Sequence, residues 1–503
     1  MYASRRLAAT RMGAIAVLTA LASAACGSNS SSGTSADSAA HVPSSIYIVI
    51  DQPVNDMDPI VSSSAPVNEI VGAALDRVGT NGAIQPDLAA SWNANSSATQ
   101  WTYKLRPNLK FSNGTPLTSA DVVFTYAAIK ANAESPENSY AQDVKSVVAQ
   151  GPLTVVFTMK EPYATWPSES TNTIIVPKAY YNPKTFQSKP IGAGPYKVVS
   201  FNGTDTVTVT ANPYYYGPKP AIKNATIQYV ANETTRLDGL ESGQYDAALL
   251  SGNNVNVAKA AGLTTKEITG AIVAYLGYGL STGPLANLKL RQAINLAVNR
   301  SALVKSILLG QGEPVEQLVS PTTFGYIKNY PVPAQNLAQA KQLVKESGYK
   351  GEQITMQYPT AYLPSPADLA QAIAGEMTQI GLNIKLVPMS SNTFLTDWFD
   401  KTLGPLYLFS AQTETMEGAG TFQYLDIFVS TTKDPTLPNL YYKMEATPNP
   451  AQRLQVIAEE NAYRNAHQYY TPLFVQNFVY VYNKKYTLPA APVDGYMNPD
   501  LFG

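Results

Sequence analysis

Apolar and polar residues alternate in several short stretches of the first half of the chain. Residues 100–105, 154–159 and 206–210 follow this period of two and are bounded by Asn, Gly or Pro, which predicts strands separated by turns. A helical pattern begins at Thr118, where Asp121 stands at the third helical position and can complete a capping box. The apolar residues of this helix share one face: Val122, Val123, Tyr126 and Ile129. The pattern predicts antiparallel sheet with an amphipathic helix packed against it.

The second half of the chain alternates helices and strands. Gly348 and Gly381 each end a helical pattern, and a strand-like run follows each glycine. The predicted order is helix 337–347, strand 354–358, helix 367–380 and strand 383–387. Upstream, residues 290–297 form one helical stripe, and a second helix is predicted to start at Asn299. This succession predicts a βαβ-type lobe and places the protein in the α/β class.

Composition is that of a globular protein and excludes several kinds of site. The chain has 503 residues, 45% of them hydrophobic and 14% charged, and a formal net charge of -1, which gives no basic footprint for nucleic acid. At about 150 residues per domain the length suggests roughly three domains. One cysteine and two histidines cannot build a disulfide framework or a Cys/His zinc site. We therefore expect no cofactor and no metal.

The N-terminus has the pattern of a bacterial lipoprotein signal. Basic residues precede an apolar run over 12–25 that is too short for an ordinary membrane span. Cys26 closes this run and is followed by Gly and Ser, as in a lipobox, although Ser23 stands where that pattern prefers Leu. Export followed by lipidation of Cys26 would hold the protein on the extracytoplasmic face of the membrane. Arg5 and Arg6 leave export by the twin-arginine pathway open beside export by the general secretory pathway. The polar stretch 27–45 is expected to be a flexible tether.

Several longer motifs occur in a characteristic order along the chain. The longest are QPDLAASW at 85–92 and WTYKLRPNLKFSNGTPLTSADV at 101–122, followed by GAGPY at 192–196, NPYY at 212–215, LESGQYD at 240–246 and LRQAINLAVNR at 290–300. In these motifs the chain resembles the family 5 extracellular solute-binding proteins, the oligopeptide, dipeptide and nickel receptors of bacterial ABC importers. The resemblance covers nearly the whole sequence.

The resemblance implies a periplasmic-binding-protein-like (Venus-flytrap) fold of two lobes, with an extra domain inserted into lobe I. The corresponding segments are a signal at 1–26, a tether at 27–45, lobe I at 46–60, 190–274 and 471–503, the inserted domain at 61–189, and lobe II at 275–470. It also implies a monomer that is not an enzyme. Such a protein closes on a small polar ligand, expected here to be an oligopeptide, and delivers it to an ABC permease with its ATPase subunits.

One segment of lobe II is expected to contact the ligand. In peptide-binding members an aspartate follows a strand end that contains tryptophan, and its carboxylate pairs with the α-ammonium of the ligand. The corresponding positions here are Tyr407, Phe409 and Gln412, where Phe409 replaces the aromatic residue and Gln412 replaces the aspartate. An amide cannot neutralise an ammonium group. Either Glu414 or Glu417 supplies the charge, or the ligand has no free amino terminus, or the segment is an ordinary loop shifted in the comparison.

Further ligand-binding candidates follow from their expected places around the cleft. Asn55 and Asp56 belong to the loop after the first strand, Tyr275 and Tyr278 to an expected hinge strand, and Trp398 to lobe II. For the two tyrosines a packing role at the hinge competes with ligand contact.

Three alternatives to a peptide-binding receptor stay open from the sequence. An oligosaccharide ligand would suit the 32 tyrosines, against 14 phenylalanines, because tyrosine rings stack on sugars and hydroxyl groups bond to them. A glycoside hydrolase needs only two well-placed carboxylates, although phosphate-loop and zinc-protease motifs are absent from the chain. A structural lipoprotein without a transporter is a third alternative. Nickel binding is disfavoured, because His467 has no second histidine near it and such a residue is usually part of the core.

Overall fold

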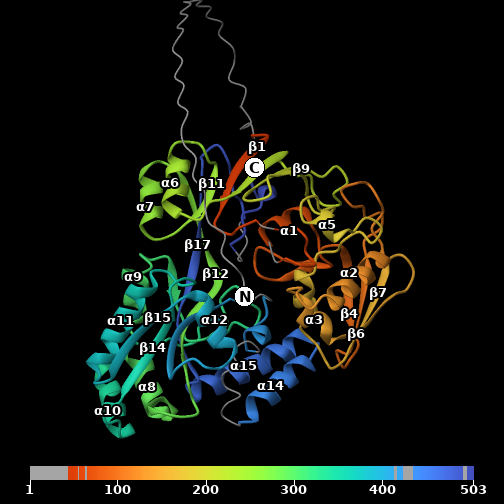
Figure 1. The fold of residues 1–503 in the computed structure, drawn as a ribbon. Helices are drawn as coiled ribbons and strands as arrows, with labels where there is room; N and C mark the ends of the chain where they lie inside the picture. Colours follow the sequence, from red (N-terminus) through yellow and green to blue (C-terminus); the bar gives the residue numbers. More distant parts are fainter. Residues whose placement is uncertain (1–42, 55, 63–64, 413–415, 423–433, 491–494) are drawn as a thin grey trace, which may run out of the picture. The chain divides into compact units, whose positions relative to one another are not determined.

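A mixed sheet runs through most of the computed structural model, which describes residues 43–54, 56–62, 65–412, 416–422, 434–490 and 495–503 (Figure 1). Within these residues the sheet has 11 strands. In the order of neighbours they are β15 (Asn383–Met389), β14 (Gln353–Pro359), β16 (Leu406–Gln412), β12 (Thr264–Tyr278), β17 (Tyr470–Tyr482), β11 (Ala247–Leu250), β1 (Ser45–Ile50), β10 (Asn224–Tyr229), β9 (Thr206–Ala211) and β8 (Tyr196–Phe201), with β13 (Gly312–Pro314) paired to β17.

Two long strands, β12 and β17, continue from one half of this sheet into the other. They pair antiparallel on both sides of a register shift between Thr269 and Val273. The earlier half of β12 lies where β17 also pairs with β11, and the later half pairs with β16. We call the β11, β1, β10, β9, β8 side the first lobe and the β14, β15, β16 side the second lobe.

Gly270 lies in the irregular segment between the two halves of β12. A Cβ atom at this position would lie 2.7 Å from the carbonyl oxygen of Gln476 and 2.7 Å from a ring carbon of Phe478. Both distances are shorter than real Cβ contacts, so the close approach of the two strands at their crossing requires glycine.

In the first lobe, helices and irregular chain cover both faces of the sheet. Helices α6 (Glu233–Glu241) and α7 (Gly252–Ala260) pack through Leu237, Leu240 and Val255 against the face that carries Val49. Helix α1 (Ala65–Val71) and the C-terminal tail with its short 3-10 helix (Pro499–Leu501) share a core with Ile48. Figure 1 shows α6 and α7 beside β11.

A second, smaller antiparallel sheet has its own core. Its strands are β4 (Ala89–Ala94), β5 (Gln100–Leu105), β7 (Thr154–Met159) and β6 (Val144–Ala149), accompanied by the hairpin β2 (Asp76–Val78) and β3 (Ile84–Pro86) and by the helices α2 (Ser119–Ala131), α3 (Asn138–Asp143) and α4 (Trp166–Glu169). We call residues 76–172 the small-sheet domain; it falls inside the segment expected to form the inserted domain. The strands predicted at 100–105 and 154–159 are confirmed as β5 and β7. The predicted helix start is also confirmed, because the Thr118 N–H donates to Asp121 Oδ2 at 2.9 Å.

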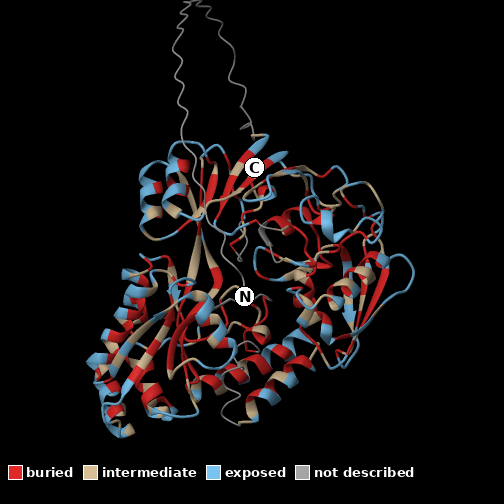
Figure 2. Ribbon diagram, in the orientation of Figure 1, coloured by how far each residue is buried: buried red, intermediate tan, exposed pale blue. Residues whose placement is uncertain are grey.

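The second lobe confirms the predicted βαβ order. Strands β14 and β15 are parallel, and α11 (Pro366–Gln379) connects them. Helix α10 (Leu337–Ser347) ends at Gly348, whose φ of 76° is the left-handed conformation that glycine adopts freely. The other long helices are α8 (Leu288–Ala297), α9 (Arg300–Ser306), α12 (Ser391–Phe399), α14 (Thr436–Glu445) and α15 (Pro450–Ala466). Figure 2 shows that the buried residues lie along the strands and the inward sides of the helices.

A buried ion pair fixes α9 to the sheet. Arg300 Nη2 lies 2.6 Å from Glu316 Oε2, with side chains only 2% and 8% exposed. Arg300 Nε donates to the carbonyl oxygen of Pro472 in β17 at 2.8 Å, and Asn295 Nδ2 donates to the other Glu316 oxygen at 2.8 Å. Both charges are therefore paired and hydrogen-bonded, as buried charges must be.

We predict that Arg300→Met lowers the free energy of unfolding by about 3 kcal/mol, because it leaves the Glu316 carboxylate buried without its cation. Urea unfolding followed by circular dichroism measures the change. Lys289→Met is the matched control, since Lys289 pairs with Glu346 at 2.9 Å where both side chains are 40% or more exposed, and it should cost less than about 1 kcal/mol. Equal effects of the two substitutions would contradict the prediction.

Candidate functional site

The parallel strands of the two lobes end at edges that face each other across the strand crossing. In the first lobe β11 pairs antiparallel with β17, and Leu250 at its carboxyl end lies opposite Val479, on the side of the crossing. In the second lobe β16 pairs antiparallel with β12, and its carboxyl end at Gln412 lies opposite Ile272. Strands β1, β14 and β15 run parallel to these two. Ligands of open α/β sheets bind outside the carboxyl ends of the strands, so these facing edges are the candidate site.

The second-lobe edge is built by the chain that follows β14 and β15. Ser410 Oγ donates to the carbonyl oxygen of Tyr362 at 2.9 Å, and the Thr360 N–H donates to the carbonyl oxygen of Met389 at 3.0 Å. These bonds hold Tyr362 at φ 71° with 56% of the residue exposed. A large aromatic side chain is therefore presented to solvent at this edge. Nothing in the sequence distinguishes Tyr362 from other loop tyrosines, so its exposure at this edge was not predicted.

The first-lobe edge includes the loop after β1, where Asp56 was predicted to contact the ligand. Asp56 Oδ1 accepts the N–H of Asp58 at 2.8 Å. Asp58 is fully buried and accepts hydrogen bonds from the Ile60 N–H and the Tyr181 hydroxyl, while burial raises the pKa of its carboxyl. Asp56 is half-buried at the loop surface, and the neighbouring candidate Asn55 lies outside the described residues.

Polar side chains also surround the strand crossing itself. Gln311 makes a two-way bond with the backbone of Gly252: its Oε1 accepts the N–H and its Nε2 donates to the carbonyl oxygen, each at 2.9 Å. Nearby, Asn477 Nδ2 donates to Glu267 Oε1 at 2.8 Å, and Thr269 Oγ1 donates to Glu313 Oε1 at 3.3 Å. These residues come from four separate segments, so no local sequence signal could have grouped them.

Four of the predicted site residues form one aromatic cluster in the second lobe. Tyr275, Trp398, Tyr407 and Phe409 pack together with Phe394 and Tyr470, and their exposed fractions range from 0% to 9%. Tyr275 meets Tyr407 edge to face at 6.2 Å between centroids and Phe409 at 6.3 Å. Burial raises the pKa values of the Tyr275 and Tyr407 hydroxyls. Through Tyr407 and Phe409 the cluster packs on one face of β16, the strand that ends at this edge.

Tyr278 is not part of this cluster. It stands three residues after Tyr275 in β12, so its side chain points to the opposite face of the sheet. There it belongs to the main core of the second lobe, and its hydroxyl bonds to the Thr471 hydroxyl at 2.6 Å.

The predicted ammonium-binding residues are only partly covered by the structure. Gln412 is the last residue of β16, with its side chain outside the described atoms, and Glu414 and the lipidation candidate Cys26 lie outside the described residues. Glu417 is 5% exposed, and its Oε1 accepts a hydrogen bond from Arg453 Nη2 at 2.8 Å. Burial raises the pKa of Glu417, and Arg453 acts in the opposite direction. A ligand ammonium at Glu417 would therefore compete with an internal cation.

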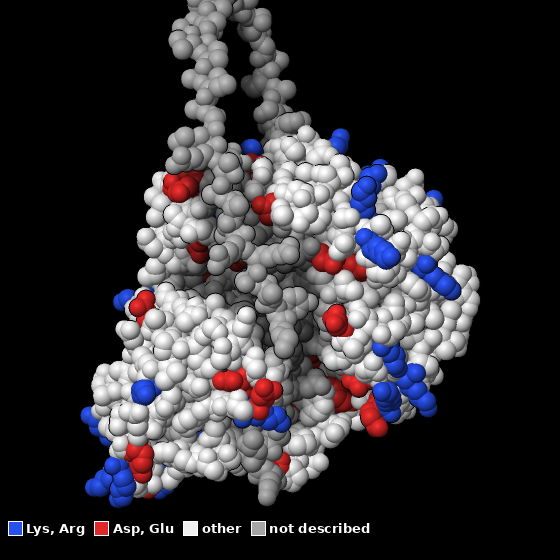
Figure 3. Space-filling model, in the orientation of Figure 1, with Lys and Arg blue, Asp and Glu red and all other residues white. Residues whose placement is uncertain are grey.

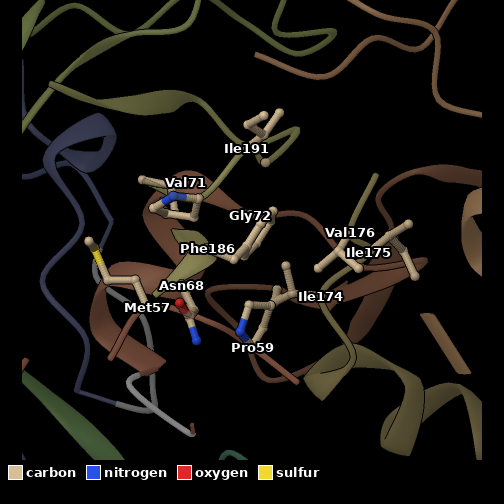
Figure 4. Close-up of a pocket in the computed structure, with 12 residues that line it drawn as sticks. Met57, Pro59, Asn68, Val71, Gly72, Ile174, Ile175, Val176, Phe186 and Ile191 are labelled. Carbon is tan, nitrogen blue, oxygen red and sulfur yellow. The ribbon is translucent and has the colours of Figure 1, made fainter. Parts of the chain in front are cut away.

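A small cavity lies between the loop after β1, helix α1 and the segment 174–192 (Figure 4). It has a volume of about 10 Å³ and is lined by Met57, Pro59, Asn68, Val71, Gly72, Ile174, Ile175, Val176, Phe186, Pro190, Ile191 and Gly192. A space of this size holds one water molecule at most. The cavity is thus too small for a peptide or a sugar.

Charge is mixed over the displayed face of the molecule. Figure 3 shows acidic and basic side chains of the described residues interspersed there, in keeping with the net charge of -1. Among the residues that the structure describes, no group of three or more His, Cys, Asp or Glu side chains could hold a metal ion. Within the same residues, no helix has the length and apolarity needed to span a membrane.

Comparisons with known proteins agree with this geometry. A crystal structure of the ABC transporter substrate-binding protein CtaP from Listeria monocytogenes superimposes with a TM-score of 0.82 at 20% identity, covering 92% of this chain and 99% of that one. The fold is thus that of the two-lobe periplasmic binding proteins. The family model of the bacterial extracellular solute-binding proteins, family 5, matches residues 83–426, and the chain belongs to that family.

Two curated relatives show how far the likeness extends. Protein XP55 of Streptomyces lividans is 27% identical over 399 residues, which is 75% of this chain and 72% of that protein. The glutathione-binding protein GsiB of Escherichia coli O1:K1 is 27% identical over 325 residues, or 60% of this chain. The chain spans 61% of the length of that glutathione-binding relative.

A pair of adjacent substitutions tests whether the aromatic cluster supports the edge by packing. Trp398→Ala should lower the free energy of unfolding by about 3 kcal/mol, because it opens a cavity among buried rings. Phe399→Ala is the control, since Phe399 is 54% exposed and should cost less than about 1 kcal/mol. Chemical denaturation without ligand measures both. A Trp398 variant as stable as the Phe399 variant would show that the cluster contributes no packing energy.

Proposed function

We propose that the protein is the substrate-binding component of an ABC importer and that it captures an oligopeptide between its two lobes. The observation that carries the proposal is the meeting of the carboxyl ends of β1, β11, β14 and β16 around the crossing of β12 and β17. Because two paired strands join the lobes at an irregular segment, a change of angle there would close one edge onto the other. Closure would remove the ligand from water, and the importer would recognise the closed form.

A peptide is favoured over the other ligand classes for two reasons. The relative GsiB is described as binding glutathione, which is itself a small peptide. The abundance of tyrosine, which favoured a sugar ligand, has a structural explanation: Tyr103, Tyr196, Tyr275, Tyr278, Tyr407 and Tyr480 are among the largest fully buried side chains. Buried rings of this kind raise the tyrosine count without contributing to a sugar-binding surface.

We assign the ligand contacts to the two edges. Tyr362 would stack on the ligand from the second lobe, and Asp56 would meet it from the first. Glu417 is already paired with Arg453, so the ammonium anchor would come from another group. Gln412 and Glu414 stay predictions of the sequence in this respect.

The remaining parts of the proposal rest on the sequence. The segments 46–60, 190–274 and 471–503 would form lobe I, 61–189 its inserted domain and 275–470 lobe II. Lipidation of Cys26 would anchor the protein to the membrane, with the tether of 27–45 allowing it to reach the permease, and the protein would act as a monomer. We propose binding without catalysis, so that ligand is released unchanged.

Isothermal titration calorimetry tests the ligand class. The panel comprises di- to hexapeptides, the same peptides with acetylated amino termini, glutathione and oligosaccharides. We expect stoichiometric binding of peptides, and a loss on acetylation would identify an ammonium anchor. Binding of oligosaccharides alone would overturn the peptide proposal, and conversion of any ligand to product would overturn the proposal of binding without catalysis.

We predict that Tyr362→Ala weakens binding of the best peptide in that panel by about 5-fold, because an aromatic contact contributes about 1 kcal/mol. Tyr442→Ala is the matched control: Tyr442 is 66% exposed but lies on α14, away from the strand ends. The control should bind as the unmodified protein does. Equal affinities of the two variants would remove Tyr362 from the site.

A further inference from the structure

A buried carboxylate joins the second lobe to the small-sheet domain. Glu445, the last residue of α14, is 5% exposed. Both of its carboxylate oxygens accept the Thr165 hydroxyl, at 3.0 and 3.1 Å, and Oε2 also accepts the Thr165 N–H at 3.3 Å. The carbonyl oxygen of Glu445 accepts the Ala164 N–H at 2.8 Å. Two successive residues of the small-sheet domain are thus bound by one residue 280 positions later in the chain.

Glu445 belongs structurally to the second lobe. Leu437 of the same helix packs in the aromatic cluster with Tyr275 and Tyr407, and Leu440 and Met444 pack with Val456 and Ile457. Thr165 and its neighbours belong to the small-sheet domain, where Trp166 and Tyr163 share a core with Phe157 and Tyr103. The contact therefore spans two separate cores, and Figure 1 shows α14 beside the small-sheet domain.

A second contact between the same two bodies lies close to the strand crossing. At the tip of the β2–β3 hairpin, a Cβ on Gly82 would lie 1.8 Å from the carbonyl oxygen of Thr322, so the backbones touch. Val78 and Ile84 of this hairpin pack against Met416 of the second lobe. The small-sheet domain therefore contacts the second lobe at two places, one at Glu445 and one at Thr322 and Met416.

The surroundings of Glu445 are rich in acidic groups. Glu417 repels its negative form and Arg453 favours it, while the Thr165 hydrogen bonds also favour it. On the side of the small-sheet domain lies Tyr163. Burial raises the pKa of its hydroxyl, and the nearby charges of Glu169, Glu445 and Tyr441 raise it further. Desolvation is the largest influence, and the balance raises the pKa of Glu445 to about 7.

We propose that Glu445 and Thr165 form a proton-sensitive clasp, which holds the small-sheet domain on the second lobe more tightly as the pH falls. When the two bodies separate, water reaches the carboxyl and its pKa returns toward 4.5, the ordinary value of glutamate. The docked form therefore binds a proton more strongly than the separated form. Docking has its full strength below about pH 4.5, and it weakens as the pH rises through about 7.

Only the functional consequence of the clasp depends on the proposed closure of the lobes: tighter docking at low pH would slow ligand release. The contact itself requires no ligand. Its test can therefore be made on the ligand-free protein, and the outcome does not depend on the peptide proposal.

Amide hydrogen exchange on the full chain reads the clasp directly, because the Ala164 and Thr165 amides donate to Glu445. Exchange is measured at pH 8 and pH 5.5 and normalised to the intrinsic rate at each pH. We expect the protection of these two amides to rise roughly 30-fold at the lower pH, since pH 5.5 lies about 1.5 units below the docked pKa of about 7 and each unit corresponds to a factor of ten. Amides inside β5 report any general change of stability.

Glu445→Gln is the decisive variant, since it keeps the shape of the side chain and removes the titration. It should give the same protection at both pH values, whereas Glu459→Gln, at a side chain 56% exposed, should respond as the unmodified protein does. Thr165→Val should lower the protection of the Ala164 amide at pH 5.5. Thr165→Ser retains the hydroxyl and should keep the protection of the unmodified protein. A pH response that persists in Glu445→Gln, or none in the unmodified protein, would overturn the proposal.

Discussion

The antiparallel pairing of β12 with β17 is the constraint on which the rest of the structure depends. These two strands run through both halves of the large sheet, and β11, β13 and β16 each pair directly with one of them. β11 and β16 each pair antiparallel with one of the two, so the carboxyl ends of the parallel strands point toward the crossing from both sides. A site between facing edges is therefore a consequence of strand direction, independent of which side chains stand there.

Buried arginines tie the helices of the second lobe to the chain around that crossing. Arg291 donates to the carbonyl oxygens of Leu285 and Gln468, and Arg300 to that of Pro472. Each guanidinium thereby ties a helix to the chain entering β17. Desolvating these cations is costly unless every donor finds an acceptor, so small displacements within the lobe are disfavoured. Bending is left to the irregular segment around Gly270, where the strand pairing is already interrupted.

Contacts away from the crossing add a second level of control. Two contacts link the small-sheet domain to the second lobe: Glu445 bonds to Thr165, and the β2–β3 hairpin touches Thr322. An extra domain in a two-lobe protein can therefore do more than enlarge the ligand space. It can supply the surfaces that set how strongly the lobes hold together, and a buried carboxyl makes that strength depend on pH.

Periodicity and turn residues determined most of the secondary structure in advance. The strands at 100–105 and 154–159, the capped helix after Thr118 and the helix that ends at Gly348 all have the expected places, because each depends on side chains within a few positions. The long motifs identified the family for the same reason, since they are read along the chain. The order of strands in the large sheet, by contrast, joins residues hundreds of positions apart.

The candidate site was the least predictable part. The sequence offered Tyr407 and Phe409, Tyr275 and Trp398 as separate ligand-binding candidates, and the structure packs all four into one buried cluster. Whether an aromatic residue is buried or presented to a ligand is decided by what packs over it. Tyr362 and Tyr407 have the same chemistry, yet one is 56% exposed and the other 1%. The sequence by itself determined the class of fold and the family, through local and ordered patterns. The tertiary structure alone decided which polar and aromatic groups meet, because burial and pairing arise from contacts between distant segments.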